Sequence, residues 1–593
     1  MADHPVVAQA RELFAQGKAE QAKAVVMRAL QKSPGDASLN YTMGGMLTEL
    51  RDLDRAAYFV GRAMELDPSR GLYASAMGEV RLYQGRLPEA VTLLERSLDL
   101  DPTLYSPRIN LASYAVTEYD HDRAERLLRE AIALRPERPE AVVNLSNVMV
   151  DTARAGEAEA MLESAAATHP ENAIVASALA NLSNYLPGLD PSVVATRHAE
   201  FGRRLSRYVR PMPHAPNPRD PGRRLRVAFL SPDFREHSVA YFADAAVSGL
   251  PREGFEVLGL YTGFVEDAVT ARLKAGCDRW IHMRDLAEVR LAEEIRRAGV
   301  DIVIELSGLT QGNSLISLAL RPAPVQVTYL GYPNSTGLPA ISHRITDSAS
   351  DGEGADARYT ERLVRLDPCF LCYTTRWELE GTPRPAAPAR TAGRPVTFGS
   401  FNVVSKLSGV TLDAWADILR RVEGSRLVLK ARSMGNPRVQ ERLRAALESR
   451  GVDGSRIEMI AYAPSHADHL ALYGRVDVAL DPFPYTGTTT TCEALSMSTP
   501  VLTLRGATHA GRVGASILAA AGMPELIAGS PAEYVENAVA LAGDRPRLGE
   551  YHRTVADRFD ASPVRDRAGF GRRLGDALRR VWIEYCQTPA TPG

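Results

Sequence analysis

Residues 477–504 read DVALDPFPYTGTTTTCEALSMSTPVLTL, and this stretch decides the fold class of the part of the chain around it. An apolar run ends at Asp481, a loop rich in proline and glycine follows, and four threonines (488–491) lead into the helical pattern CEALSM. A second apolar run, PVLTL, comes next. A buried strand, a loop, a helix and another strand in this order predict a βαβ unit of a parallel sheet.

Strands and helices alternate in two longer series around this stretch. The first series starts at RLRVAFLS (224–231) and runs through FEVLGLYT, a helix near LAEEIRRAG, DIVIELSG, VQVTYLG and HRITD. The second starts at VTFGSF and runs through LDAWADILRRV, SRLVLKA, VQERLRAALESRG and RIEMI into the quoted stretch. We therefore expect two Rossmann-like lobes with parallel sheets, over residues 225–385 and 386–590, the second ending in a closing C-terminal helix.

Proline-rich segments bound these lobes. PMPHAPNPRDPGRR lies in a linker that we place at 206–224, and EGTPRPAAPARTAGRP separates the two series. Neither lobe has a Gly-x-Gly-x-x-Gly motif after its first strand, and the chain has no P-loop lysine motif. Dinucleotide-dependent oxidoreductases and P-loop kinases therefore lose support.

Prolines recur at one fixed interval in the N-terminal part of the chain, and this interval is the period of tetratricopeptide repeats. They are Pro34, Pro68, Pro102, Pro136 and Pro170. Small residues recur with the same period at three other positions of each repeat, and one of these series is Ala22, Ala56, Ala90, Ala124 and Ala158. Since small side chains let neighbouring helices approach closely, we expect an α-solenoid over 1–205, with five repeats to about residue 170 and then capping helices.

A solenoid of this kind presents a groove that suits an extended peptide or a protein partner. A passive spacer or a dimerisation arm is the alternative, because repeats alone never identify their ligand. A homo-oligomer is compatible with the sequence.

The composition sets outer limits on the function. The 593 residues are 45% hydrophobic and 24% charged, with a net charge of -2. No overall field recruits nucleic acid or an anionic membrane, so an anionic ligand has to be met by local groups. The chain has no apolar run long enough to span a membrane and no secretory signal core, and its five cysteines are scattered, so we expect a soluble cytoplasmic protein.

One pair of cysteines, Cys369 and Cys372, forms a CxxC motif in the apolar run PCFLCY. It has no second pair, which favours a structural role over a metal or redox site.

The threonine run of the opening stretch has the chemistry of a phosphate site. Backbone N–H groups at a helix N-terminus, with threonine hydroxyls beside them, bind a diphosphate without fixed positive charge. Glu493 lies in the same first turn and is suited to accept hydrogen bonds from ribose hydroxyls. Simple N-capping of the helix by threonine is the alternative.

Four segments together resemble the bacterial and plant relatives of O-GlcNAc transferase, including the SPINDLY group. They are RVAFLSPDFREHSVAYF, LRPAPVQVTYLGYPNSTGLPAISHRITD, FGSFNVVSKLSGVTLDAWADIL and LDPFPYTGTTTTCEALSMSTPVLTLRGATHAGRVGASIL. The resemblance covers nearly the whole chain, with repeats before lobes. It implies a two-lobed α/β glycosyltransferase of the GT-B type that moves a sugar from a nucleotide donor to serine or threonine hydroxyls of a protein, with inversion.

The resemblance also implies roles for individual residues. Lys406 matches the lysine that contacts the donor diphosphate, where a cation neutralises charge that develops on the leaving nucleotide. His237 matches a histidine of the cleft, acting either as the base or as a positioning residue, since departing phosphate oxygens are an alternative proton acceptor.

Further positions are implied as contacts of the nucleotide sugar. Thr488, Thr489 and Thr490 match phosphate and sugar contacts, and Glu493 matches the ribose-binding carboxylate. His469 is the expected stacking partner of the base, with His466 as a rival, and Ala463 lies just before it. Tyr332 and Pro333 are placed on the sugar side of the cleft, and His509 on the phosphate side or in a structural role.

Two departures leave the donor open. Val403 stands where the animal enzymes have a phosphate-contacting glutamine, and Ser465 stands where they have a lysine near ribose. UDP-GlcNAc is the first expectation. The alternative donors are GDP-fucose, as in the SPINDLY group, and a CMP-nonulosonic acid, as in flagellin glycosyltransferases. A repeat scaffold without catalytic activity is the alternative function.

No pair of carboxylates is placed in the sequence as a metal-binding DxD motif. We therefore expect no cofactor and no metal, with the nucleotide sugar as co-substrate and a protein acceptor, flagellin among the candidates.

Overall fold

The computed structural model describes residues 4–213, 217–284, 286–381 and 393–588. These residues fall into two compact units, one built from residues 4–148 and 286–290 and the other from the remaining described residues. The predicted linkers lie partly outside the described residues. In the described part of the chain, no helix is both long and apolar enough to cross a membrane.

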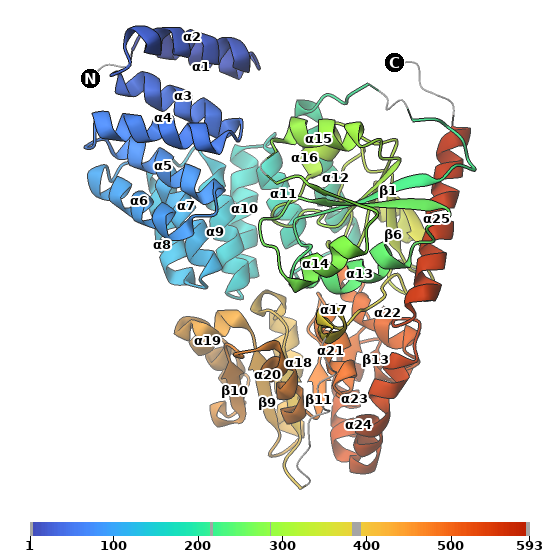
Figure 1. The fold of residues 1–593 in the computed structure, drawn as a ribbon. Helices are drawn as coiled ribbons and strands as arrows, with labels where there is room; N and C mark the ends of the chain where they lie inside the picture. Colours follow the sequence, from blue (N-terminus) through green and yellow to red (C-terminus); the bar gives the residue numbers. More distant parts are fainter. Residues whose placement is uncertain (1–3, 214–216, 285, 382–392, 589–593) are drawn as a thin grey trace. The chain divides into compact units, whose positions relative to one another are not determined.

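Twelve helices of the described chain precede the first strand, in pairs joined by short turns (Figure 1). The helices are α1 (Val6–Ala15), α2 (Ala19–Lys32), α3 (Ala37–Glu49), α4 (Leu53–Leu66), α5 (Gly71–Tyr83), α6 (Leu87–Leu100), α7 (Ser106–Thr117), α8 (His121–Leu134), α9 (Pro139–Asp151), α10 (Ala155–Thr168), α11 (Ala173–Leu182) and α12 (Pro191–Tyr208). One period of the proline pattern corresponds to one helix pair.

Close packing explains why the repeat positions are small. A side chain at Gly44 would place its Cβ 2.4 Å from Val60 Cγ2, and one at Gly78 would lie 2.7 Å from Leu94 Cγ. The alanines of the recurring series, such as Ala22 and Ala56, are completely buried. The predicted tetratricopeptide solenoid is confirmed.

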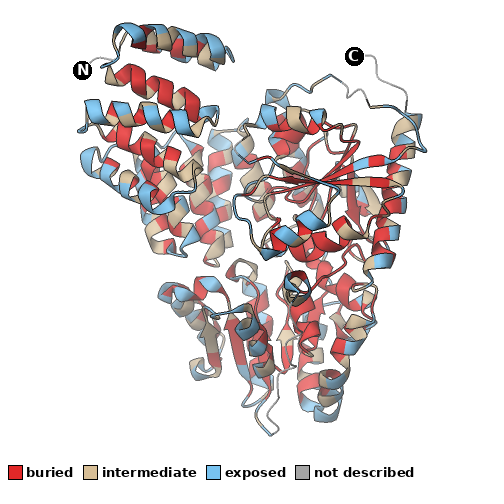
Figure 2. Ribbon diagram, in the orientation of Figure 1, coloured by how far each residue is buried: buried red, intermediate tan, exposed pale blue. Residues whose placement is uncertain are grey.

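The first lobe contains a sheet of seven parallel strands in the order β3-β2-β1-β4-β5-β6-β7. The strands are β1 (Leu225–Ser231), β2 (Phe255–Tyr261), β3 (Arg279–His282), β4 (Ile302–Glu305), β5 (Val325–Thr328), β6 (His343–Thr346) and β7 (Arg362–Arg365). Figure 1 shows helices on both faces of this sheet, and Figure 2 shows its central strands as buried. The edge strands β3 and β7 are partly exposed. These helices are α13 (Ala240–Gly249), α14 (Ala268–Ala275), α15 (Glu288–Arg297) and α16 (Leu315–Ala319).

The second lobe contains a sheet of six parallel strands in the order β10-β9-β8-β11-β12-β13. The strands are β8 (Thr397–Ser400), β9 (Arg426–Lys430), β10 (Ile457–Ile460), β11 (Val478–Leu480), β12 (Val501–Leu504) and β13 (Ile527–Ala528). Its helices are α18 (Gly409–Arg421), α19 (Pro437–Glu448), α20 (His466–Ala471), α21 (Thr489–Ser496), α22 (Val513–Ala520), α23 (Pro531–Gly543) and α24 (Arg545–Asp560). In both sheets the first strand of the lobe lies in the centre, and later strands are added on either side of it, as in doubly wound folds. The predicted two-lobed α/β architecture is confirmed.

The chain passes between the lobes twice. It leaves the first lobe through α17 (Arg376–Glu380) and returns through the long helix α25 (Arg567–Gln587), which packs on α13. At this contact Gly249 and Gly571 lie so close that a Cβ on Gly571 would be 2.0 Å from the Gly249 carbonyl oxygen. The C-terminal helix therefore ties the second lobe to the first.

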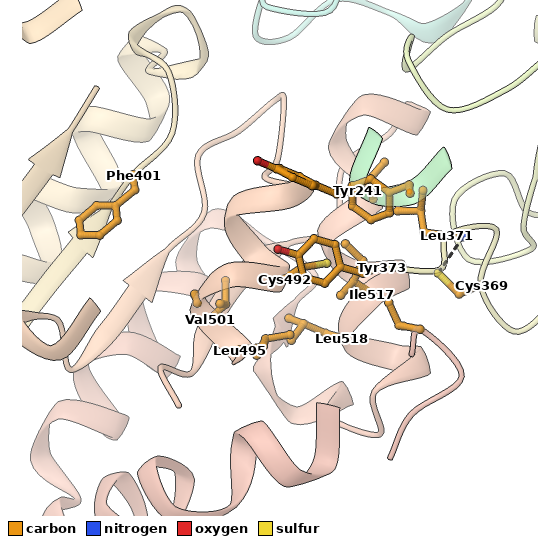
Figure 3. Packing of buried hydrophobic residues seen from close by; sticks show 14 of the residues in the cluster. Tyr241, Cys369, Leu371, Tyr373, Phe401, Cys492, Leu495, Val501, Ile517 and Leu518 are labelled. Carbon is orange, nitrogen blue, oxygen red and sulfur yellow. Dashed lines mark hydrogen bonds between the residues drawn. The ribbon is translucent and has the colours of Figure 1, made fainter. Parts of the chain in front are cut away.

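The CxxC pair lies in the hydrophobic core, in the segment that precedes α17. Cys369 and Cys372 are both buried and free. Figure 3 shows Cys369 and Cys492 among Tyr241, Tyr373 and Ile517, with the Leu371 N–H donating to Cys369 Sγ at 3.5 Å. Burial raises the pKa of the Cys372 thiol to about 12, so it is neutral at physiological pH.

Candidate functional site

The predicted site residues follow strands at the positions where doubly wound sheets bind ligands. In such sheets the crevice opens at the carboxyl ends of the strands, where neighbouring strands run off in opposite directions along the sheet. In the first sheet this point lies between β1 and β4, and in the second between β8 and β11. His237 follows β1, Lys406 follows β8, and Thr488 follows β11.

Lys406 is held by the loop that leads to the threonine run. It ends a short 3-10 helix, Val404–Lys406. Its Nζ donates to the Thr486 carbonyl at 2.7 Å and lies 4.0 Å from the centre of the Tyr485 ring. Burial lowers the pKa of Lys406 to about 8, and the carboxylate of Asp481 opposes this change. The ammonium is therefore fixed in place and still mostly charged at neutral pH.

The threonine run presents a helix N-terminus at the same strand end. Thr488 is the N-cap of α21 and makes no side-chain capping bond, which argues against the simple capping role. The Thr490 hydroxyl donates to Asn402 Oδ1 at 3.1 Å, which ties the run to the loop after β8. The N–H groups of the first turn of α21 are thus not used by a side-chain cap, as a diphosphate site requires.

Glu493 and His469 contact each other. His469 Nε2 lies 3.1 Å from Glu493 Oε2, and the Tyr473 hydroxyl donates to the same oxygen at 3.4 Å. Burial by itself would raise the pKa of Glu493, but its interactions with His469, His466 and Lys430 lower it below the usual value. The carboxylate is therefore ionised, and its second oxygen is available to ribose hydroxyls.

Aromatic rings surround this pair. His469 lies 5.8 Å from Phe401 and 5.6 Å from His466, between ring centres. Burial lowers the pKa of His466 to about 4, so that ring is neutral near pH 7. Both histidines therefore stand beside the expected base site, with Ala463 half-buried in the segment before α20.

His237 lies in the loop after β1, and its side chain is 39% exposed. Its Nδ1 accepts a hydrogen bond from the Val239 N–H at 3.3 Å and lies 3.7 Å from Asp233 Oδ2. Burial lowers its pKa, while the Asp233 carboxylate acts in the opposite direction. A neutral ring that accepts at Nδ1 carries its proton on Nε2, which makes Nε2 a hydrogen-bond donor.

Tyr332 lies in the loop after β5. Its phenol is buried and bonded to the segment of residues 184–198 before the lobes, because it accepts from Asn184 Nδ2 at 3.0 Å and lies 2.7 Å from His198 Nε2. The His198 Nδ1 faces the Val194 carbonyl at 2.7 Å, so the phenol donates to Nε2. These bonds hold the loop after β5 against the segment of residues 184–198, and Pro333 beside Tyr332 is also buried. The placement of Tyr332 and Pro333 on the sugar side of the cleft stays a prediction.

His509 joins the two lobes. It is 3% exposed, and its Nδ1 lies 2.6 Å from Asp351 Oδ2 of the first lobe. Thr346 and Tyr359 donate to the same carboxylate. Burial would raise the pKa of Asp351, but the charge of His509 holds it well below the usual range. The contact with Asp351 fits a structural role for His509, which is one of the two roles that the sequence left open.

Sequence reasoning missed three neighbours of this site. Asn402 accepts a hydrogen bond from Thr490, and the Tyr485 ring makes a cation–π contact with the Lys406 ammonium. Asp481 is buried beneath the loop that leads to the threonine run. Only Asp481 gave a signal, as an acidic residue that closes an apolar strand. In the described residues, no group of three or more His, Cys, Asp or Glu side chains is placed to hold a metal ion.

Two doubly wound lobes, with a lysine and a helix N-terminus at the switch point of the second, have the architecture of the GT-B glycosyltransferase fold. Comparison with known families agrees. The model of glycosyl transferase family 41 matches residues 191–376 and 390–572, and a tetratricopeptide repeat model matches 115–182. The chain belongs to glycosyl transferase family 41.

Relatives with names are found among plant proteins and in a solved bacterial structure. The chain is 39% identical over 409 residues to the probable UDP-N-acetylglucosamine–peptide N-acetylglucosaminyltransferase SPINDLY of Petunia hybrida, and 38% identical over 411 residues to that of Arabidopsis thaliana. These matches cover 68% of this chain but only 43% and 44% of the relatives. The chain therefore spans less than half the length of these curated relatives.

The solved structure is a mutant of the O-GlcNAc transferase of Thermobaculum terrenum. It is 31% identical to this chain, with a TM-score of 0.65, and the match covers 98% of this chain and 97% of that one. The resemblance to the O-GlcNAc transferase and SPINDLY family, inferred from four sequence segments, is confirmed.

Proposed function

We propose that this protein transfers GlcNAc from UDP-GlcNAc to serine or threonine hydroxyls of a protein acceptor, with inversion and without a metal. The observation that carries the proposal is the convergence of the Lys406 ammonium, the N-terminus of α21 and the Glu493 carboxylate at the carboxyl edge of one sheet. The relatives named for peptide N-acetylglucosaminyl transfer support the donor and the acceptor class.

Each group has a separate task in this reaction. Glu493 accepts from the ribose, while His469 and His466 lie beside the base. The α21 N-terminus and Lys406 hold the diphosphate, on which negative charge grows as the bond to the sugar breaks. A fixed ammonium at this point lowers the barrier because it is already oriented before the reaction starts.

The proton of the acceptor hydroxyl needs a separate destination. If the His237 ring carries its proton on Nε2, as its contact with the Val239 N–H favours, it donates a hydrogen bond and does not accept the proton. This supports a positioning role for His237, with a phosphate oxygen of the donor taking the proton. The repeats supply the expected site for the protein acceptor.

A panel of donors tests the proposal. The full chain in EDTA is mixed with UDP-GlcNAc, UDP-GalNAc, GDP-fucose or a CMP-nonulosonate, and thermal unfolding is followed. At a donor concentration 100 times the Kd, binding stabilises the fold by about 2.7 kcal/mol. We expect this only with a UDP sugar. Stabilisation only by the CMP or GDP donor contradicts the proposed donor, and dependence on added metal contradicts the metal-independent mechanism.

A further inference from the structure

Asp481 is the first residue after β11 and lies beneath the loop that forms the phosphate site. Its side chain is 2% exposed. Oδ1 accepts from the Gly487 N–H at 2.9 Å, and Oδ2 accepts from the Thr503 hydroxyl at 2.9 Å. The Thr491 hydroxyl approaches Oδ1 at 3.5 Å. The carboxylate therefore bonds to both ends of the turn that carries Thr488, Thr489 and Thr490.

Two glycines make room for this carboxylate. A Cβ on Gly487 would lie 2.6 Å from Asp481 Oδ1 and 2.7 Å from the Thr490 hydroxyl. A Cβ on Gly514 would lie 2.5 Å from Asp481 Oδ2. A position this tight fixes the carboxylate, and through the Gly487 N–H it fixes the turn above it.

The charge of Asp481 is not paired directly. Among the described residues, no basic group makes an ion pair with it within 4.0 Å, and the cation that acts on it is Lys406. The other titratable groups that feel its charge are the buried phenols of Tyr473 and Tyr534. Lys406 in turn faces the Tyr485 ring and the Thr486 carbonyl. Asp481 and Lys406 bond to adjacent residues of one loop, Gly487 and Thr486, so the carboxylate lies on the loop that holds the ammonium and acts as its counter-charge.

We infer that Asp481 is a positioning residue of the transfer reaction, whose buried carboxylate keeps the Lys406 ammonium charged and holds the Gly487–Thr491 turn in its phosphate-binding shape. The effect of Asp481 on sugar transfer rests on the proposed function, whereas its effect on the Lys406 pKa is measured without any transfer. Asp481 does not touch the donor in this account, because it lies below the turn and acts through Lys406 and the Gly487 N–H.

The charges of the pair define a working range of pH. Burial raises the pKa of Asp481 to about 6, with the hydrogen bonds and Lys406 opposing the rise, and the pKa of Lys406 is about 8. Between these values the carboxylate is ionised and the ammonium is protonated. When Asp481 loses its charge, the ammonium loses its counter-charge and its pKa falls further.

The pKa of Lys406 is measurable without any sugar transfer. The chain has six lysines (Lys18, Lys23, Lys32, Lys274, Lys406, Lys430), so NMR of lysine labelled with 13C at Cε gives few signals. In Asp481→Asn we expect the Lys406 pKa to fall by about one pH unit, the lower end of the usual effect of an opposite charge. The Lys430 signal is the internal reference. An unchanged Lys406 pKa overturns the inference.

A matched variant separates charge from folding. Asp477 is another buried carboxylate, next to the other end of β11, where it pairs with Arg394 at 3.0 Å. Asp477→Asn should leave the Lys406 pKa unchanged, and an equal fall in both variants would contradict the inference. If Asp481→Asn does not fold, the wild-type protein still provides the test. Its Lys406 signal should show a second inflection near pH 6, where Asp481 titrates. The absence of this inflection overturns the inference.

Kinetics then links the pair to the reaction. The pH dependence of kcat/KM reports the ionisations of the free enzyme. Its alkaline limb should move to lower pH in Asp481→Asn, and Asp481→Glu should restore part of the difference. If no donor is turned over by the wild-type protein, the proposed function fails while the NMR result still decides the inference.

Discussion

Replacing Lys406 with methionine separates the catalytic task of this lysine from its effect on stability. Methionine is close in volume and fills the space next to the Tyr485 ring, but it removes the charge and the bond to the Thr486 carbonyl. Loss of one fixed group that stabilises developing negative charge lowers kcat by roughly 10²- to 10³-fold, or about 2.7–4 kcal/mol. We expect a loss of this size, with a smaller change in KM.

Stability should respond in the opposite sense. The pKa of Lys406 falls from its ordinary value of 10.5 to about 8 on burial, so the folded protein holds the charged form at a cost of about 3 kcal/mol at pH 7, from 1.36 kcal/mol per pKa unit. Removing the charge recovers this cost, although Asp481 then loses its counter-charge, which offsets part of the gain. We therefore expect a melting temperature that is unchanged or higher.

The lowered pKa of Lys406 also sets how stability depends on pH. Because the folded pKa lies below the unfolded one, the unfolded chain binds more protons between pH 8 and 10.5, and wild-type stability rises with pH in that window. Lys406→Met should lack this rise. Urea unfolding at several pH values and UDP release from UDP-GlcNAc are the assays, with Lys274→Met as the exposed control. Activity within tenfold of wild type, or a lower melting temperature that accounts for the loss, refutes the reasoning.

Three further variants test neighbouring contacts. Tyr332→Phe leaves one N–H of the Asn184 amide and the buried His198 Nε2 without a partner, at roughly 1–3 kcal/mol each, so the melting temperature should fall while kcat is kept, and a kcat loss at unchanged stability would place the phenol in the sugar site. Asp351→Asn removes a carboxylate whose pKa is held well below the usual range, so the difference in unfolding free energy should be full at pH 7, begin to shrink below about pH 4 and vanish only as pH falls through the much lower folded pKa, whereas a constant difference argues against the ionic contact. Glu493→Gln should weaken UDP binding in calorimetry by roughly 10- to 100-fold, as expected for a charged hydrogen bond, and an unchanged Kd would remove Glu493 from the ribose site.

Most of the fold could be predicted from the sequence because the patterns that mark its helices and strands are local. Apolar runs with turn residues at their ends marked most strands, and prolines at a fixed interval marked the helix pairs. The missed strands β3, β7 and β13 are edge strands of their sheets and are two to four residues long. Short edge strands lack the continuous apolar run that identifies buried ones.

The site was partly accessible for a related reason. Residues that follow central strands meet at one edge of the sheet, where His237, Lys406 and Thr488 lie. The threonine run before a helix pointed to Thr488, whereas His237 and Lys406 were predicted only through the family resemblance. The partners of Tyr332 were not accessible, because Asn184 and His198 belong to a segment far earlier in the chain. The same holds for the pair of Asp481 and Lys406, which depends on how β8 and β11 pair in the sheet.

The chemistry itself is the most direct test of the account. Purified full chain is incubated in EDTA with UDP-GlcNAc and a library of serine and threonine peptides, and UDP release and peptide mass are measured together. The account predicts UDP release with GlcNAc added to a hydroxyl side chain, and loss of both in Lys406→Met. Absence of transfer from UDP-GlcNAc, with transfer from a GDP or CMP donor or from none, contradicts it.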